Sequence, residues 1–138
     1  MREIEFRGKR VIGCGHVMVF GNLIVADTGV FIEEHGENYE VVPDTVGMYT
    51  GFNSSITHHG QGYGVKVYGG DIIDPHINTK YTTPMVVTWD DKIGGWSLRK
   101  PNSRPCAYVF GAWINECVVI GNIHENPDLL RTNDTRLN

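Results

Sequence analysis

Seventeen glycines divide this chain of 138 residues into short segments rich in β-branched and aromatic residues. Glycine adopts positive φ without steric cost, so glycines between apolar runs favour tight turns and bulges between strands. Period-two alternation supports strands in several segments; at the N-terminus, Ile4 and Phe6 alternate with charged residues that we expect on the opposite face. The pattern predicts a mainly β fold of short antiparallel strands that form a barrel or sandwich.

The strongest strand signal is the run Pro-Met-Val-Val-Thr-Trp at 84–89. Residues 90–95 are typical of a hairpin turn, and 95–99 is the expected partner strand. Segment 107–115 fits a strand or a short helix, and the two alternatives stay open. Gly21-Asn22 is expected to interrupt a strand pattern, and loops are expected at 33–38, 51–62 and 74–83. Further strand candidates are 16–20, 23–25, 28–32, 39–42, 45–50, 64–68 and 116–121.

One short C-terminal helix is predicted at 126–131. Asn126 offers an N-cap acceptor to free helix amides, Pro127 fits the first helical position, and Asp128 favours the positive end of the helix dipole. Residues 132–138 are polar and are expected to form a flexible tail.

The length fits a single domain, with two β lobes at about 1–60 and 61–131 sharing a core as a possible internal division. Cys14, Cys106 and Cys117 are odd in number and form no CxxC pair, so reduced thiols are expected. No apolar run approaches the ~20 residues of a membrane span, and the first residues lack the apolar core of a signal peptide. A cytoplasmic protein with no membrane association is the expectation.

The net charge of −4 is unevenly distributed along the chain. No Lys or Arg occurs between Arg10 and Lys66, a stretch with six acidic residues, whereas the stretch from Lys66 to Arg104 has six basic residues against four aspartates. Such polarity can steer a partner or favour packing against another copy of the chain. The alternative is a solvated acidic face that only keeps the protein in solution.

A candidate nucleic-acid surface combines aromatic and basic side chains. Aromatic rings can stack on bases while basic groups hold phosphates. The alternative is that Trp89 and Trp96 face each other across the hairpin inside the core, and the acidic net charge favours this alternative. The candidate binding residues are Trp89, Trp96, Arg99, Lys100, Arg104 and Tyr108.

A weaker candidate is a metal site, because imidazole and carboxylate ligands suit zinc or manganese. Adjacent histidines on an extended chain point to opposite faces, and Asp71 is better explained as a turn residue after Gly69-Gly70. We therefore predict no metal and no cofactor. The residues of this weak candidate are His58, His59 and His76, with Asp71 and Asp74.

The sequence contains no recognisable catalytic constellation. The serines lack a GxSxG context, and the sequence has neither a P-loop nor a GxGxxG motif. A non-enzymatic protein is the expectation, with a metal-dependent hydrolase as the least favoured alternative.

Four segments in the same order resemble YopX-like phage proteins. The opening 1–9 looks like the start of these proteins, and 42–51 (VPDTVGMYTG) resembles their V-P-E-T-V-G-Q-Y-T-G segment. Segment 66–73 (KVYGGDII) is similar to K-I-Y-E-G-D-I-V, and 119–130 (VIGNIHENPDLL) to V-I-G-N-I-Y-E-N-P-E-L-L. Residues 52–65 depart from the family pattern, and the sequence assigns this loop no role.

This resemblance implies a phage or prophage origin, a β-rich fold with an SH3-like barrel at 64–121, and self-association into a homo-oligomer. It implies no catalytic residues. The expected function is that of an accessory protein that associates with itself and binds a phage or host macromolecule. The alternative is a nucleic-acid-binding barrel that uses the region from Trp89 to Arg104.

Overall fold

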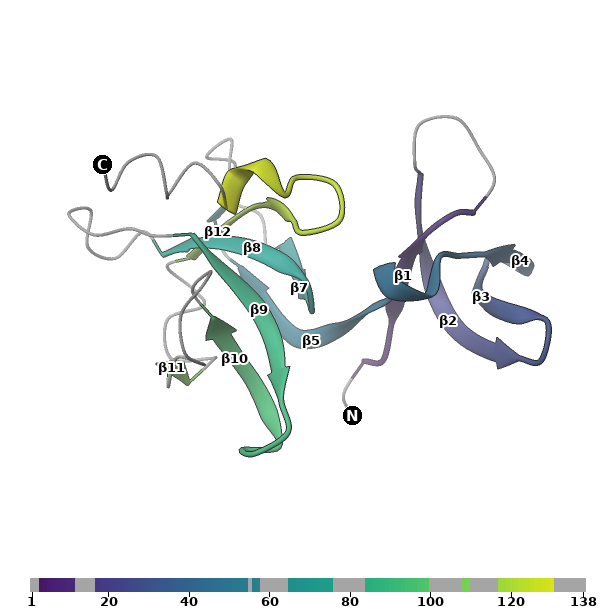
Figure 1. Ribbon diagram of the computed structural model, residues 1–138, viewed down its shortest axis with the longest axis horizontal. Helices are drawn as coiled ribbons and strands as arrows, with labels where there is room; N and C mark the ends of the chain where they lie inside the picture. Colours follow the sequence, from purple (N-terminus) through teal and green to yellow (C-terminus); the bar gives the residue numbers. More distant parts are fainter. Residues whose placement is uncertain are drawn as a thin grey trace. The chain divides into compact units, whose positions relative to one another are not determined.

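The structure is a computed structural model that describes residues 3–11, 17–54, 56–57, 65–75, 84–99, 108–109 and 117–130. The chain divides into two compact units, Met1–Gly51 and Phe52–Asn138. Strands dominate both units, which confirms the predicted mainly β class (Figure 1). No helix in the described ranges is long and apolar enough to span a membrane.

The first unit is an antiparallel meander of four strands, followed by a short turn of helix and a fifth strand. Its strands follow the order β4-β3-β2-β1-β5, and β5 continues past Gly51 into the second unit, where β7 follows it in the sheet. The elements are β1 (Phe6–Lys9), β2 (Met18–Ala26), β3 (Gly29–Glu34), β4 (Glu37–Glu40), the 3-10 helix η1 (Pro43–Thr45) and β5 (Gly47–Ser54).

Backbone hydrogen bonds close this meander into a ring. Arg10 forms a bridge with Val41, directly after β1 and β4 respectively. The amide of Val42 donates to the carbonyl of Lys9, and the amide of Val11 donates to the carbonyl of Glu40, each over 2.9 Å. The first unit is therefore a small closed barrel, which leaves few unpaired strand edges. Its core holds Val19, Ile32 and Val41, with Phe6, Val30, Tyr39 and Val46 packed against them.

The second unit contains a mixed sheet with the strand order β11-β10-β9-β8-β12-β6. Neighbouring strands are antiparallel except β12 and β6, which are parallel. Its core holds Val67, Ile73, Met85, Val87 and Leu98, with Trp96 and Val119 packed against them. The strands are β6 (Ile56–Thr57), β7 (Val65–Tyr68), β8 (Asp71–Pro75), β9 (Met85–Asp90), β10 (Gly95–Arg99), β11 (Tyr108–Val109) and β12 (Cys117–Asn122).

The predicted break at Gly21-Asn22 is wrong, since β2 runs through it from Met18 to Ala26. A Cβ on Gly21 would lie 1.9 Å from the carbonyl oxygen of Glu33, so this glycine permits a close backbone approach. The predicted loop at 33–38 is also too long. β3 and β4 are joined by a turn at His35 and Gly36, with φ of 53° and 86°.

Two further loop boundaries and one facing assignment differ from the prediction. β5 and β6 occupy part of the expected loop 51–62, and β8 extends to Pro75, inside the expected loop 74–83. At the N-terminus, Phe6 packs against the core as expected, but Ile4 lies before β1 and is 64% exposed, and Arg7 is only 7% exposed, so the expected facing is wrong for these two residues. In segment 107–115, Tyr108 and Val109 form a strand and the other residues lie outside the described ranges.

Candidate tryptophan hairpin

The predicted hairpin at 84–99 is confirmed by strands β9 and β10. Their register places Trp89 opposite Trp96, and the turn between the strands occupies 91–94. Asp90 organises this turn: its Oδ1 accepts the amide of Lys92, and its carbonyl accepts the amide of Gly94, each over 2.9 Å. Gly94 has φ of 65°, which an L-residue rarely adopts. The turn therefore fixes the strand register that pairs the two tryptophans.

The two indoles meet edge to face, with ring centroids 5.4 Å apart and an interplanar angle of 83°. Trp96 packs against the core of the second unit, but Trp89 is 49% exposed. The Trp89 Nε1–H donates to Asp91 Oδ1 over 2.9 Å. The rings thus face each other, as one alternative expected, but the pair spans the boundary between core and solvent. Trp89 presents a ring that its neighbours already hold in place.

The described part of the chain provides no hydrogen-bond acceptor for the indole N–H of Trp96. Its Nε1 is buried. An unsatisfied buried donor costs about 1–3 kcal/mol. The burial of the ring beside the core must offset this cost.

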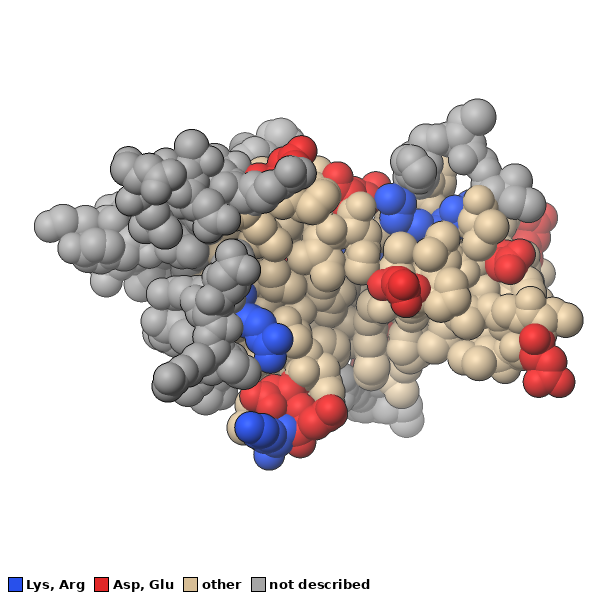
Figure 2. Space-filling view, viewed as in Figure 1, with Lys and Arg blue, Asp and Glu red and all other residues tan. Residues whose placement is uncertain are grey.

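The structure places the candidate basic residues differently from the indoles. Arg99 is exposed and follows Trp96 by three positions in β10, so the period of a strand puts it on the opposite face of the hairpin. Asp90 and Asp91 lie closer to Trp89 in the chain, and Figure 2 shows acidic and basic side chains together at the hairpin tip. Tyr108 pairs with Leu98 through the backbone. Lys100 and Arg104 lie outside the described residues.

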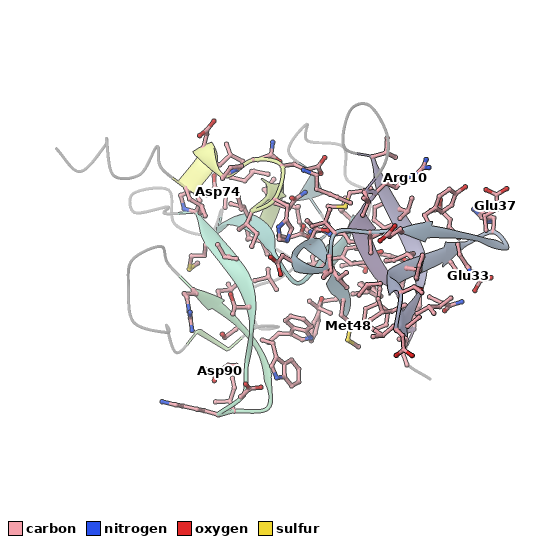
Figure 3. All side chains as sticks on the ribbon, turned by 45° about the vertical axis from the view of Figure 1, so that its right-hand side comes forward. Arg10, Glu33, Glu37, Met48, Asp74 and Asp90 are labelled. Atoms are coloured by element: carbon pink, nitrogen blue, oxygen red, sulfur yellow. The ribbon has the colours of Figure 1, made fainter. Side chains whose placement is uncertain are left out.

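The candidate metal ligands are only partly described. His58, His59 and His76 lie outside the described residues, and the rest of the described chain holds no group of three potential ligands. Asp71 is buried, and its Oδ2 accepts the amide of Tyr68 over 2.8 Å, as expected for a turn residue between β7 and β8. Asp74, labelled in Figure 3, has a buried Oδ1 for which the described residues provide no hydrogen-bond donor.

A polar turn that sequence reasoning missed follows β12. Asn122 is 7% exposed, and its Oδ1 accepts the amides of His124 and Glu125 over 3.0 and 2.9 Å. Its Nδ2 donates to Glu125 Oε1 over 2.9 Å. The spacing of Asn122 before a Glu is the available signal, because Asn side chains commonly bond amides two and three residues ahead.

The helical turn after it forms where predicted, but Asn126 acts differently from the expected N-cap. Residues 128–130 are helical, and the amides of Leu129 and Leu130 donate to the carbonyls three residues earlier. Asn126 Oδ1 accepts the amide of Asn122 over 3.2 Å, so it bonds back to the end of β12. The side chain therefore fastens the helical turn to the strand.

Two of the segments singled out in the sequence meet here. β8 pairs with β12, with Asp71 opposite Asn122, and the amide of Ile123 donates to the carbonyl of Gly70 over 2.9 Å. A β-bulge interrupts the pairing between Val119 and Gly121. The segments 66–73 and 119–130 are thus parts of one structural unit, which accounts for their residues by folding roles.

Comparisons with known proteins give a family and a fold. The family model described as YopX protein matches residues 26–131, more than half of the chain. The chain is also similar to the crystal structure of protein EF1440 from Enterococcus faecalis, with a TM-score of 0.56 and 20% identity over 94% of this chain and 99% of that chain. At this identity the likeness shows the fold alone. No functionally curated protein matches.

Proposed function

Because the chain belongs to the YopX protein family, we propose that it is a phage- or prophage-encoded accessory protein that is non-enzymatic, associates with itself and binds another macromolecule. The observation that carries the proposal is the half-exposed ring of Trp89 on the hairpin. Tryptophan is enriched among the few residues that dominate binding energy at interfaces. The hairpin is therefore the proposed contact surface.

The fixed position of this ring supports a binding role. Trp96 contacts the Trp89 ring edge to face, and Asp91 accepts its indole N–H. A side chain that is already ordered loses less rotamer freedom when a partner covers it. Both contacts thus favour affinity without any change in the hairpin.

A protein partner fits this surface better than a nucleic acid. The carboxylate of Asp91 lies against the Trp89 indole, where the phosphates of a stacked strand would meet a negative charge. Arg99 is on the other face of the hairpin and does not line the indole surface. Nucleic-acid binding remains the second candidate because an exposed indole can stack on a base.

The partner is tested by affinity capture from prophage-induced cells, using the full chain and two matched variants. Trp89→Ala removes the proposed anchor, whereas Ile93→Ala removes a 60% exposed apolar side chain from the turn of the same hairpin. We expect quantitative mass spectrometry to find a protein that Trp89→Ala loses and Ile93→Ala retains. Equal capture by all three proteins contradicts a role for the hairpin.

Self-association and nucleic-acid binding have separate tests. Size-exclusion chromatography with light scattering measures the mass in solution, and a monomer at micromolar concentration contradicts self-association. Electrophoretic shifts with single-stranded and duplex probes test the second candidate. Salt-sensitive shifts that Trp89→Ala removes would favour nucleic acid over a protein partner.

A further inference from the structure

We propose that the outer face of the first unit is a docking surface for a basic segment of another protein that also carries apolar side chains. This outer barrel face consists of Phe20, Asn22, Ile24, Phe31, Glu33 and Glu40, with the buried Arg7 opposite Phe20 at its edge. It shares no residue with the tryptophan hairpin. The two proposals can therefore fail independently.

The strand register places these six residues on one face. Asn22 lies opposite Glu33, Ile24 lies opposite Phe31, and Phe31 in turn lies opposite Glu40. Residues directly opposite each other share a face of a sheet. Phe20 belongs with Asn22 and Ile24 because side chains two apart in a strand point the same way. The alternate positions Val19 and Ile32 fill the barrel core, so the six residues lie on the outside.

The apolar members of this face remain partly in contact with solvent. Phe20 is 38% exposed and Ile24 is 36% exposed, while Phe31 between strands β2 and β4 is half-buried. A single exposed apolar residue needs no explanation. Neighbouring apolar residues that share one sheet face, with polar residues around them, are typical of an interaction site.

Carboxylates flank this apolar centre, and one of them is held in place. Asn22 Nδ2 donates to Glu33 Oε1 over 3.0 Å. Glu40 lies opposite Phe31 and is exposed. Glu33, labelled in Figure 3, thus stands beside the apolar residues with a fixed orientation. Ordered carboxylates of this kind suit Lys or Arg side chains.

The charge of the whole unit selects the partner class. The first unit has eight acidic and four basic residues, whereas the second has eight of each, so the first unit carries all of the net −4. Figure 2 shows acidic side chains spread over the visible surface of the first unit. Nucleic acid is repelled by this charge, and so is the same face of a second copy. A basic partner segment is attracted to it.

The test measures fluorescence anisotropy of labelled synthetic peptides against the full chain. One peptide alternates Lys with Val; a second alternates Lys with Ser and keeps only the charge; a third alternates Glu with Val and keeps only the apolar groups. We expect the Lys/Val peptide to bind, with affinity that falls as salt rises, and the other two to bind on the order of tenfold more weakly or not at all.

Variants locate the binding. Phe20→Ser combined with Ile24→Ser is expected to weaken binding of the Lys/Val peptide on the order of tenfold. Glu33→Gln is expected to weaken it less and to reduce the salt dependence. Matched controls outside the face are Val42→Ser, at a position 39% exposed, and the exposed Asp44→Asn. If circular dichroism shows that the double variant is unfolded, the single variants Ile24→Thr and Glu33→Gln are compared with the controls instead.

Three results would overturn the proposal. The first is equal binding of the Lys/Val and Lys/Ser peptides, which reduces the effect to charge alone. The second is equal affinity in the face variants and the controls. The third is a self-associated wild type that the Phe20 and Ile24 substitutions convert to a monomer, which makes the face an interface between copies. Trp89→Ala is expected to leave peptide binding unchanged, and that result separates this surface from the hairpin.

Discussion

The hydroxyl of Thr45 accepts the amide of Lys9 over 3.0 Å, although 36 residues separate the two in the chain. The same hydroxyl donates to the carbonyl of Val42 over 2.6 Å. Thr45 is buried in η1, and Lys9 ends β1 beside the bridge of Arg10 and Val41. One side chain therefore ties the first strand to the turn that precedes the last strand of the barrel.

Replacing Thr45 by Val is expected to lower the free energy of unfolding by about 1–3 kcal/mol. Valine has a similar shape but leaves the amide of Lys9 without its acceptor. Urea denaturation measures the change, and Thr45→Ser is the control because it keeps the hydroxyl. A loss of stability in Thr45→Ser without a loss in Thr45→Val would mean that the threonine methyl group, not the hydrogen bond, matters.

Gly21→Ala is expected to be among the most destabilising single substitutions in the first unit. The added Cβ would lie 1.9 Å from a backbone oxygen, that of Glu33, so strands must move apart at a cost of about 3 kcal/mol. Gly95→Ala is the matched control, because no atom of the described residues lies within 4 Å of its added Cβ. Thermal denaturation compares the two, and similar midpoints would contradict the close approach.

Asn122→Ala is expected to destabilise the second unit by about 2 kcal/mol. The substitution removes the acceptor of two amides, those of His124 and Glu125, at a position that is largely buried. Glu125→Gln is the control, because its amide oxygen can still accept the Asn122 side chain. Hydrogen exchange at His124 and Glu125 is the direct measurement. Unchanged protection in Asn122→Ala would show that other groups hold the turn.

The pKa of Tyr39 is raised above its ordinary value of 10.0, chiefly because its hydroxyl donates a hydrogen bond to Glu37. The protonated phenol keeps this bond, so its stabilising effect is complete below the unfolded pKa and is lost as pH rises through the higher folded pKa. Glu37→Gln is expected to lower the pKa of Tyr39. Absorbance titration of the phenolate, compared with Tyr39→Phe, measures it, and Asp27→Asn is the charge control. A Tyr39 pKa unaffected by Glu37→Gln would contradict the assignment.

Local pattern was enough to locate most strands but not their faces. The hairpin at 84–99 follows from a β-branched run, a turn and a second run, all close together in the chain. Arg7 shows the limit: alternation distinguishes the two faces of a strand, but distant contacts decide how far each face is buried. The role of Gly21 could not be predicted for the same reason, because it depends on the close approach of Glu33 in a neighbouring strand.

The candidate site was predictable to a similar extent. Pairing of Trp89 with Trp96 follows from the hairpin, and the three-residue offset of Arg99 from Trp96 already implies opposite faces. The half exposure of Trp89 could not be predicted, because it depends on where the core of the second unit ends. The role of Asn122 was not predicted, because it depends on hydrogen bonds from nearby amides to its side chain, which a strand pattern does not indicate.

The closure of the first unit also governs when it can fold during synthesis. The backbone hydrogen bonds that complete the ring join Lys9 and Arg10 to Val41 and Val42. The last strand, β5, pairs with β1 at Gly47 and Met48. Domains fold as units while the ribosome adds residues one at a time. The nascent barrel must therefore wait until its last strand has left the ribosome, and until then β1 has an open edge that a chaperone or another chain can occupy.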